Sequence, residues 1–516
     1  MKNKPFLLAL MAGTALVFTA APAAAQEAQA QDQAEGEAEA GPLTPEEAAA
    51  KAAFLQEQVE SLQAQLDALK KQVGVVTPSW KGAPQLEDKE AGWSFKPRGR
   101  IQYDAGYVEN PGDAIATRNL GFNTRARRIR LGAEGTIPGG FGYKFEMDFA
   151  NSSVGFGDVV LTYVPKDRPW SLILGNHETW NGLEQISSSR FISFLERAQM
   201  NDAFTNTRRI GLSLGLADKG NTARFNAGIF AAHSIDGSFD NEGWIGAARA
   251  VYSPQAMGGQ LHFGANFQHR EFQSNNAGTA SSSAGAPSTN QLGRYRARPF
   301  LQTTDVRFVD TGAFAARSDN IFGAEFAGVF KSLHVTGEAQ WTKVNAYKAG
   351  DRATGLDAFS ATNSVLVASG DPSFFGWYVE AGYFLTGETR GYRNGVWDRT
   401  KVLKPFSQGG WGALQLNARY DTLDLEDGDL KQGFTNNFTT GAFTPSNNLA
   451  RGGTQTGYQA SLIWIPEDYM RLLLQYTRTE VEGGPFAATV RPGSTAPLDE
   501  RSYGVNSVAV RAQVDF

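Results

Sequence analysis

The last eleven residues read Asn506-Ser-Val-Ala-Val-Arg-Ala-Gln-Val-Asp-Phe516, and they decide the fold. Side chains of an extended strand alternate between two faces. One face of this stretch is apolar and the other is mostly polar: the first carries Val508, Val510, Ala512, Val514 and Phe516, the second Ser507, Ala509, Arg511, Gln513 and Asp515. A single such segment also suits an edge strand of a soluble sheet. If the pattern repeats, it indicates a barrel with lipid outside and water inside.

The alternation does repeat. Sixteen strands are predicted, at roughly 98–107, 125–136, 141–149, 157–164, 170–176, 208–216, 223–231, 244–252, 260–268, 320–330, 332–341, 376–385, 411–420, 456–465, 468–478 and 505–516. The connections between them are alternately long and short, which is typical of bacterial outer-membrane barrels. The sequence therefore predicts an all-β fold, a 16-stranded antiparallel transmembrane β-barrel over residues 93–516, preceded by a short N-terminal α-helical coiled coil.

Two connections break the rule. The connection 150–156 is short for the side with long loops, and 386–410 is long for the side with tight turns. One strand pair near them is therefore open to another assignment.

The chain opens with the three parts of a secretory signal peptide. Two lysines precede an apolar run, and small residues at positions 23–25 offer a cleavage site. Residues 1–25 are therefore expected to be removed on export. Residues 26–43 contain no large apolar side chain before Leu43, so we expect a flexible leader there.

Residues 44–74 show a heptad period. Thr44 is a plausible N-cap, and apolar residues then recur at spacings of four and three: Ala48, Ala52, Leu55, Val59, Leu62, Leu66, Leu69 and Val73. Positions off this seam are polar, charged or small apart from Phe54, which favours a partner helix over packing within one domain. The flanking residues are mostly Gln, so charge pairing does not select the partner. We expect a periplasmic coiled coil that self-associates as a trimer, followed by a linker at 75–92.

Composition excludes several functions. There is no cysteine, which removes disulfides and thiol or Cys-zinc chemistry, and no later window reaches about 18 apolar residues, which excludes a helical membrane protein. Loss of the signal peptide would leave 46 basic and 53 acidic residues without a basic stripe, so nucleic-acid binding has no support. The five histidines lack metal-ligand spacing and no Gly-x-Ser-x-Gly elbow occurs. We therefore predict no enzyme, metal or cofactor site.

A sixteen-stranded barrel is too wide for side chains to fill, so the fold implies a water-filled lumen. The connection 176–207 is the candidate to narrow it, because it carries much apolar surface for an external loop: Leu183, Ile186, Phe191, Ile192, Phe194 and Leu195. We expect this connection to fold into the barrel with a short helix near 190–199.

Arginines are the candidate functional residues of the lumen. The expected anion path and constriction comprise Arg190, Arg197, Arg208, Arg209, Arg128, Arg130 and Arg100. The alternative for Arg197 is a buried ion pair with Glu184 or Glu196 that holds the loop to the wall. A second basic run, Arg390, Arg393, Arg399 and Lys401, is either a periplasmic anion vestibule or a solvated loop.

Several stretches resemble the phosphate-selective porin O and P family. They are Arg127-Arg-Ile-Arg-Leu-Gly-Ala-Glu-Gly-Thr-Ile-Pro-Gly-Gly-Phe-Gly-Tyr-Lys-Phe-Glu-Met-Asp-Phe-Ala-Asn151, Gly182-Leu-Glu-Gln-Ile-Ser-Ser-Ser-Arg-Phe-Ile-Ser-Phe-Leu-Glu-Arg197, Arg208-Arg-Ile-Gly-Leu212 and Leu385-Thr-Gly-Glu-Thr-Arg390. The resemblance spans about residues 95–516. It implies a trimeric sixteen-stranded channel in the outer membrane of a Gram-negative bacterium that takes up anions, phosphate above all, past arginines and a few lysines.

The sequence departs from the family where charge matters. Gly175-Asn-His-Glu178 stands where the family has a Gly-Gln-Phe-Lys segment, so this segment has no lysine and contains His177, which is mostly neutral at pH 7. The predicted lumen faces are also balanced, with eleven cations against ten carboxylates: Arg98, Arg100, Arg128, Arg130, Lys144, Arg209, Arg224, Arg249, Arg419, Arg471 and Arg511 against Asp104, Glu134, Glu146, Asp148, Asp158, Glu325, Glu338, Glu380, Asp421 and Asp515. Such a balance gives no support for strong phosphate selectivity.

Arg125 and Arg127 share strand parity with Ile129 and Leu131. They would therefore face outward near the extracellular rim and bind lipopolysaccharide phosphates, unless a local bulge turns them inward.

The favoured function is passive diffusion of small inorganic anions through a homotrimeric outer-membrane porin surrounded by lipid and lipopolysaccharide. The alternatives are a general or sugar-type porin with weak ion selectivity, and a structural tether between outer membrane and cell wall. Trp180, Trp341 and Trp377 would stack on sugars, but the last two share parity with lipid-facing residues.

Overall fold

The computed structural model describes residues 44–72, 79–80, 82–112, 115, 120–150, 154–232, 235, 243–272, 292–347, 365–437 and 442–516. The expected signal peptide and leader, residues 1–43, lie outside them. The chain divides into two units, Met1–Gly74 and Val75–Phe516.

The first unit contains one long helix, α2 (Pro45–Gln72). It begins where the capping residues predict a helix. Three seam residues, Leu55, Val59 and Leu62, are more than half exposed. Their pairing with a partner helix stays a prediction. Among the helices described, none combines the length and the apolar character needed to cross a membrane.

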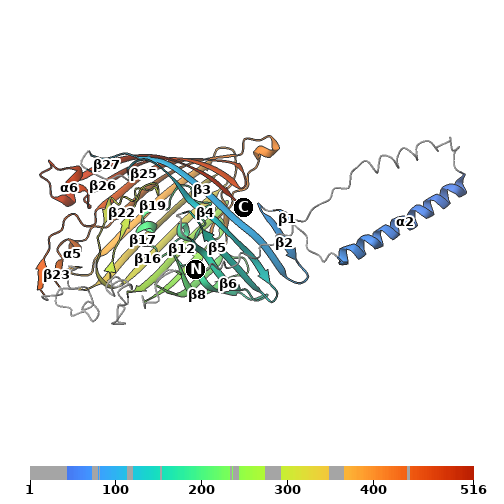
Figure 1. Ribbon diagram of the computed structural model, residues 1–516, viewed down its shortest axis with the longest axis horizontal. Helices are drawn as coiled ribbons and strands as arrows, with labels where there is room; N and C mark the ends of the chain where they lie inside the picture. The colour runs from blue at the N-terminus through green and yellow to red at the C-terminus, as the bar shows by residue number, and fades with distance from the viewer. Residues whose placement is uncertain are drawn as a thin grey trace, which may run out of the picture. The chain divides into compact units, whose positions relative to one another are not determined.

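The second unit is a closed antiparallel barrel (Figure 1). The staves in order are β3 (Trp93–Val108), β4 (Gly121–Ile137), β5 (Phe141–Asp148), β6 (Gly155–Tyr163), β7 (Trp170–Glu178), β8 (Arg208–Ala217), β9 (Ala223–Ala231), β10 (Trp244–Tyr252), β12 (Gly259–Glu271), β16 (Phe314–Phe330), β17 (Leu333–Ala346), β19 (Ser373–Phe384), β22 (Ala413–Asp424), β25 (Thr454–Glu467), β26 (Met470–Glu482) and β27 (Ser502–Asp515). Each pairs with the next, and β27 pairs with β3 to close the ring. The predicted sixteen strands are confirmed.

The final strand shows why the sequence closes in this way. Val508, Val510 and Val514 are 45 to 47 % exposed on the outer surface. The intervening residues of β27 are buried inside, among them Arg511 and Asp515. Phe516 continues the pairing through two backbone hydrogen bonds of 3.0 Å with Gly99 of β3. Its ring lies 2.1 Å from the position of a Cβ at residue 99, so any other residue there would displace the ring.

The predicted strands on either side of the two irregular connections are present and paired. β5 pairs with β6 although residues 149–154 join them closely, and β19 pairs with β22 across the 385–412 connection. The second connection is long because it contains its own hairpin, β20 (Gly391–Arg393) with β21 (Val396–Asp398), and a short 3-10 helix, η3 (Phe406–Gln408).

The segment 75–92, expected as a linker, contains two short strands. β1 (Ser79–Trp80) pairs with β2 (Pro84–Asp88), and β2 pairs with the first residues of β3. A turn closed by a Gly92 N–H donating to the Asp88 carbonyl reverses the chain between them. The sheet therefore extends beyond the predicted barrel.

The remaining elements belong to the long connections. They are α3 (Leu183–Ile186), α4 (Gln199–Ala203), β11 (Gln255–Ala256), β13 (Leu292–Gly293), β14 (Arg296–Ala297), β15 (Val309–Asp310), β18 (Val365–Val367), α5 (Gly428–Lys431), β23 (Phe434–Asn437), β24 (Ala442–Pro445), α6 (Ala487–Val490) and η4 (Leu498–Glu500).

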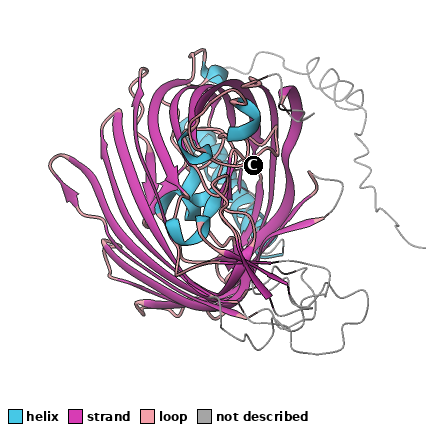
Figure 2. Ribbon diagram, turned by 90° about the vertical axis from the view of Figure 1, so that its left-hand side faces the viewer, coloured by secondary structure: helices cyan, strands magenta, loops and turns pink. Residues whose placement is uncertain are grey.

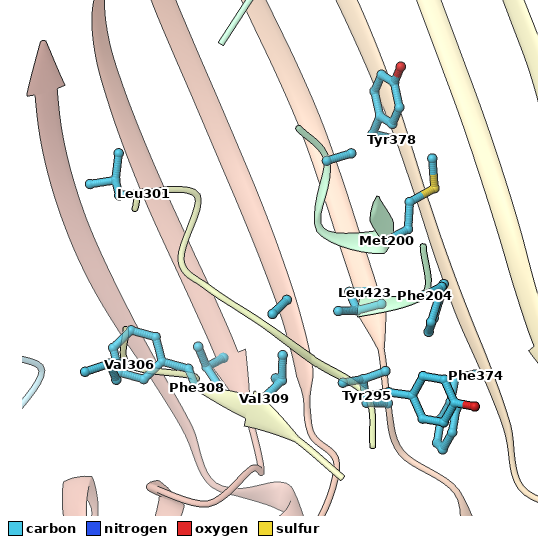
Figure 3. Packing of buried hydrophobic residues seen from close by; sticks show 14 of the residues in the cluster. Met200, Phe204, Tyr295, Leu301, Val306, Phe308, Val309, Phe374, Tyr378 and Leu423 are labelled. Carbon is cyan, nitrogen blue, oxygen red and sulfur yellow. The ribbon is translucent and has the colours of Figure 1, made fainter. Parts of the chain in front are cut away.

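An apolar core lies inside the ring of strands. Figure 2 shows the ring of strands from one end, and α4 contacts the wall strands β19 and β22. Met200 of α4 and Phe204, which follows this helix, pack near Tyr295, Phe374 and Leu423 (Figure 3). Connections from the long-loop end therefore fill part of the interior that sixteen strands alone leave open.

Candidate functional site: a cationic passage beside an in-folded loop

The β7–β8 connection, residues 179–207, is held against inward-facing wall residues. Arg419 of β22 pairs with Glu184 of this connection and with Glu380 of β19, and its guanidinium lies 4.4 Å from the Phe194 ring centroid and 4.5 Å from that of Tyr378. A cation between two aromatic faces and two carboxylates fixes the middle of the connection to one wall.

A second anchor lies on the adjoining wall. Arg511 of β27 pairs with Asp104 at 2.6 Å and Glu196 at 2.9 Å, and it donates to the Leu195 carbonyl at 2.5 Å. Burial favours the protonated form of Glu196, but Arg127 and Arg511 outweigh it and hold the pKa of Glu196 well below its usual range.

The helix expected near 190–199 is wrong. Helices α3 and α4 flank an irregular stretch of turns and bends in which wall side chains bind several backbone groups. Arg471 donates to the carbonyls of Arg190 and Ile192, and Gln475 accepts from the Leu195 N–H at 2.8 Å. Backbone groups that find partners outside the segment do not need a helical ladder.

The 385–412 connection also enters the interior, from the end with tight turns. Its Trp397 N–H donates to Ser187 Oγ at 2.9 Å, and Tyr392 Oη lies 2.6 Å from His262 Nδ1. Leu183, Ala327, Val329 and Trp397 form one buried cluster. Two connections from opposite ends thus meet and fill the side of the lumen next to β12–β22.

The four expected vestibule residues have different environments. Arg390 pairs with Glu380 at 2.8 Å and lies 3.9 Å from the Trp397 ring centroid. Arg399 pairs with Asp515. Arg393 pairs with Asp398 but its side chain is 75 % exposed, and Lys401 is exposed. Buried carboxylates therefore neutralise two of these four cations.

On the opposite side, next to β3–β8, a cavity of about 620 Å³ remains open. It is lined by eleven cationic side chains and five carboxylates, a net charge of +6: Arg98, Arg100, Arg127, Arg128, Arg130, Lys144, Arg190, Arg197, Arg208, Arg209 and Arg298 against Glu146, Asp158, Glu178, Glu196 and Asp202. All seven arginines expected along the path line this one cavity.

Two of these arginines are buried, and some of their N–H donors have no hydrogen-bond acceptor. Arg128 donates to Gln102 Oε1 at 2.8 Å, and within the described part of the chain no carboxylate oxygen lies within 4.0 Å of it. Arg100 donates to Ser189 Oγ at 2.7 Å and lies 3.7 Å from Glu146. The Nε atoms of both arginines have no hydrogen-bond partner. Buried donors without acceptors favour an anion nearby.

The other path residues are paired with the wall. Arg130 pairs with Glu146 at 2.6 Å and Asp148 at 2.7 Å, and Arg208 pairs with Asp158 at 2.5 Å and Glu178 at 2.7 Å. Such pairs hold guanidinium groups in place while leaving other edges toward the cavity.

The remaining path residues interact with nearby connections. Arg190 pairs with Asp515 at 3.3 Å. Arg197 donates to the carbonyls of Glu184 and Ser187, both at 2.8 Å, so it holds the loop through backbone rather than through an ion pair. Arg209 donates to the Ala232 carbonyl at 2.8 Å.

Arg125 and Arg127 face inward, and the outward assignment is wrong. The register between β3 and β4 shifts after Gln102, which pairs with Arg128, because Tyr103 pairs with Ala126. Arg127 is the extra residue of this bulge and binds Glu196 through two hydrogen bonds of 2.7 and 3.0 Å. The shift also reverses the parity of Arg125, which donates to the Gln302 carbonyl at 3.1 Å.

His177 has the contacts of a neutral imidazole. Nδ1 lies 2.8 Å from the Gly175 carbonyl, which accepts only, and Nε2 lies 2.7 Å from Ser213 Oγ. Nδ1 therefore carries a proton, while the Ser213 hydroxyl can donate to Nε2 and accept from Trp180 Nε1 at 2.9 Å. Both ring nitrogens of His177 therefore have hydrogen-bond partners without a positive charge on the imidazole.

The segment 292–313 was not predicted to line the lumen. Arg298, Phe300, Leu301 and Gln302 line the cavity, and Arg298 pairs with Asp202 at 3.2 Å. The signal was present, since Arg294-Tyr-Arg-Ala-Arg-Pro-Phe-Leu301 mixes apolar and basic residues in a long connection just as 176–207 does.

The balanced charge count does not describe the passage. Six of the eleven predicted lumen cations line the cavity, but only two of the ten predicted carboxylates do. Glu325, Glu338, Glu380 and Asp421 lie under the packed connections, bound to partners such as Arg249, Tyr378, Arg419 and Gln199.

A closed sixteen-stranded barrel with an apolar outer face and a charged internal passage defines an outer-membrane channel of the porin type. Among the described residues there is no group of histidine and carboxylate side chains that would hold a metal ion. The family model of "Phosphate-selective porin O and P" matches residues 95–516, so the chain belongs to that family of Gram-negative outer-membrane channels.

Several proteins of known sequence or structure are similar to this chain. An uncharacterized protein of Caulobacter vibrioides is 34 % identical over 448 residues, covering 85 % of this chain and 77 % of that protein. Porin O of Pseudomonas aeruginosa is 25 % identical over 369 residues, covering 68 % and 77 %. Similar solved structures include the outer membrane channel DcaP of Acinetobacter baumannii, with a TM-score of 0.44, 14 % identity and coverage of 83 % and 98 %. Another is an anion-selective porin from Comamonas acidovorans, with a TM-score of 0.44, 13 % identity and coverage of 82 % and 100 %.

Proposed function

We propose that this chain forms a homotrimeric channel for passive diffusion of small anions, phosphate among them, and that the connection 176–207 is its constriction. The observation that carries the proposal is the charge of the open passage, +6 over its lining residues. Rings and ladders of one sign set ion preference in a pore.

Arg128 supports anions in particular. A buried guanidinium without a carboxylate partner pays a desolvation cost that a passing oxyanion relieves. Arg100 and Arg190 lie on the same passage, so an anion has successive binding groups rather than one deep site. Several moderate sites suit conduction, because an ion must leave as readily as it enters.

The trimer is supported by the exposed seam of α2. Leu55, Val59 and Leu62 form one apolar stripe that a partner helix would cover.

The test is the zero-current potential of the purified protein in a planar bilayer under a KCl gradient, followed by titration of phosphate against the chloride current. The proposal expects chloride preference and block by phosphate well below the chloride concentration. A unit charge about 5 Å from an ion in water contributes about 0.8 kcal/mol, or about fourfold, and it acts with opposite sign on chloride and potassium. Arg128→Gln should therefore lower the chloride-to-potassium permeability ratio about 16-fold.

Arg294→Gln is the matched control, because it removes one positive charge from a residue that does not line the cavity. A weakly selective channel without phosphate block would refute the anion assignment and favour a general diffusion porin. Equal effects of the two substitutions would show that overall charge, not the passage, sets the selectivity.

A further inference from the structure

Part of the wall of the passage is apolar, although side chains that face a water-filled lumen are expected to be polar. Val160 and Ile173 point inward, since Val160 pairs in register with Lys144 and Ile173 with Ser213, both on the lumen side. Both line the cavity and both are half-buried rather than covered. Other inward apolar residues, such as Phe230, Ile245 and Ile463, are at most 2 % exposed.

The in-folded connection contributes a second apolar surface to the same cavity. Within α3, Leu183 is fully buried in the cluster with Trp397, whereas Ile186 on the same short helix is half-buried and lines the cavity. The wall and the connection thus present branched aliphatic side chains to one space.

Cations border this apolar surface directly. Lys144 is the cross-strand neighbour of Val160 and pairs with Asp158, to which Arg208 also binds at 2.5 Å. Cross-strand neighbours have Cβ atoms about 5 Å apart. An ion held by these cations therefore has aliphatic surface within the length of one small molecule.

We propose that the preferred solutes are small organic carboxylates with a branched or aromatic body, rather than inorganic anions alone. This inference rests on the proposed anion channel and names its substrate class. The carboxylate is held by the cations that border this surface, Lys144 and Arg208, and the body lies against Val160, Ile173 and Ile186. Pockets that bind organic ligands combine apolar lining with a few placed polar groups, and this passage has that composition.

The experiment compares benzoate with acetate as blockers of the chloride current through the full-length protein in planar bilayers. Both carry one carboxylate, so their ratio of half-blocking concentrations reports the apolar body alone. If the ring of benzoate buries as much apolar surface as roughly two methylene groups, its half-blocking concentration should be about tenfold lower than that of acetate.

Two variants test the assigned residues without changing charge. Val160→Thr with Ile173→Thr should reduce the benzoate preference to about twofold or less. Thr162→Val should increase it, because Thr162 pairs with Ile173 and lines the same cavity. The ratio is measured within each variant, so a change in overall conductance does not affect it.

Equal block by benzoate and acetate in the parent protein, together with chloride preference, would overturn this inference and leave the anion channel standing. Absence of chloride preference would overturn the proposed function itself. A benzoate preference that survives the double substitution would show that the apolar body does not contact Val160 and Ile173.

Discussion

Substitution of Arg419 by Gln is expected to release the middle of the 176–207 connection. The guanidinium is the only described cation in ion-pair distance of Glu184, and the exposed side-chain fractions are 0 % for Arg419 and 3 % for Glu184. Removing one partner of a buried ion pair costs about 3–5 kcal/mol, because Glu184 then stays buried without a cation, whereas Glu380 keeps its pairing with Arg390. The contacts with Phe194 and Tyr378 are lost as well.

The magnitude can be read from amide hydrogen exchange of residues 183–204. The Ala198 N–H donates to Glu184 Oε2 at 2.8 Å and the Leu195 N–H to Gln475 at 2.8 Å, so both report whether the connection stays in place. Loss of about 3–5 kcal/mol lowers protection by a factor of about 10² to 10³·⁵. Single-channel conductance should rise at the same time, since the connection would no longer occupy a fixed place in the lumen.

The double variant Arg419→Gln with Glu184→Gln is the matched control. It removes the carboxylate that is left without a cation, while Glu380 keeps its pairing with Arg390 at 2.8 Å. Protection should therefore recover in part relative to Arg419→Gln alone. Unchanged exchange and conductance in Arg419→Gln would refute the reasoning, because the connection would then be held by its other contacts alone.

Two further predictions concern assembly. Gly99→Val should lower the yield of folded barrel, because an ideal Cβ at this position would lie 2.1 Å from the Phe516 ring. Gly493→Val is the control and should leave the yield unchanged, because no atom lies within 4 Å of its Cβ position. Equal yields of the two variants, on gels that separate folded from heat-unfolded protein, would contradict this prediction. Leu62→Glu should lower the temperature at which trimers dissociate, since a buried leucine contributes about 1.5–3 kcal/mol per chain; Gln63→Glu is the control, and identical dissociation temperatures would count against the seam.

The barrel itself was predictable because its physics is local. Each strand carries its own alternation of apolar and polar residues. The outward position of Val508 and the inward position of Arg511 can therefore be predicted from this strand alone. A bulge cannot be predicted in this way, because one extra residue in the pairing of β4 does not change the composition of the strand. Arg127 therefore looked outward until the register with β3 was known.

The contents of the lumen were less predictable than its wall. The apolar content of 176–207 indicated in-folding, but whether Phe191–Arg197 forms a helix depends on acceptors and donors from distant strands, Arg471 and Gln475 among them. The unusual length of 385–412 was visible in the sequence, yet length alone does not say that a connection turns inward. Its contacts with Ser187 and His262 decide that.

The division of the lumen explains why total charge is a poor guide to selectivity in this barrel. Carboxylates such as Glu380 are needed where connections pack, because they bind the arginines that hold those connections. Arg128, which has no carboxylate within ion-pair distance among the described residues, instead lines the open cavity. Anchoring therefore draws negative charge to the filled side and leaves positive charge on the open side. A balanced lumen thus becomes a cationic passage without any excess of basic residues in the sequence.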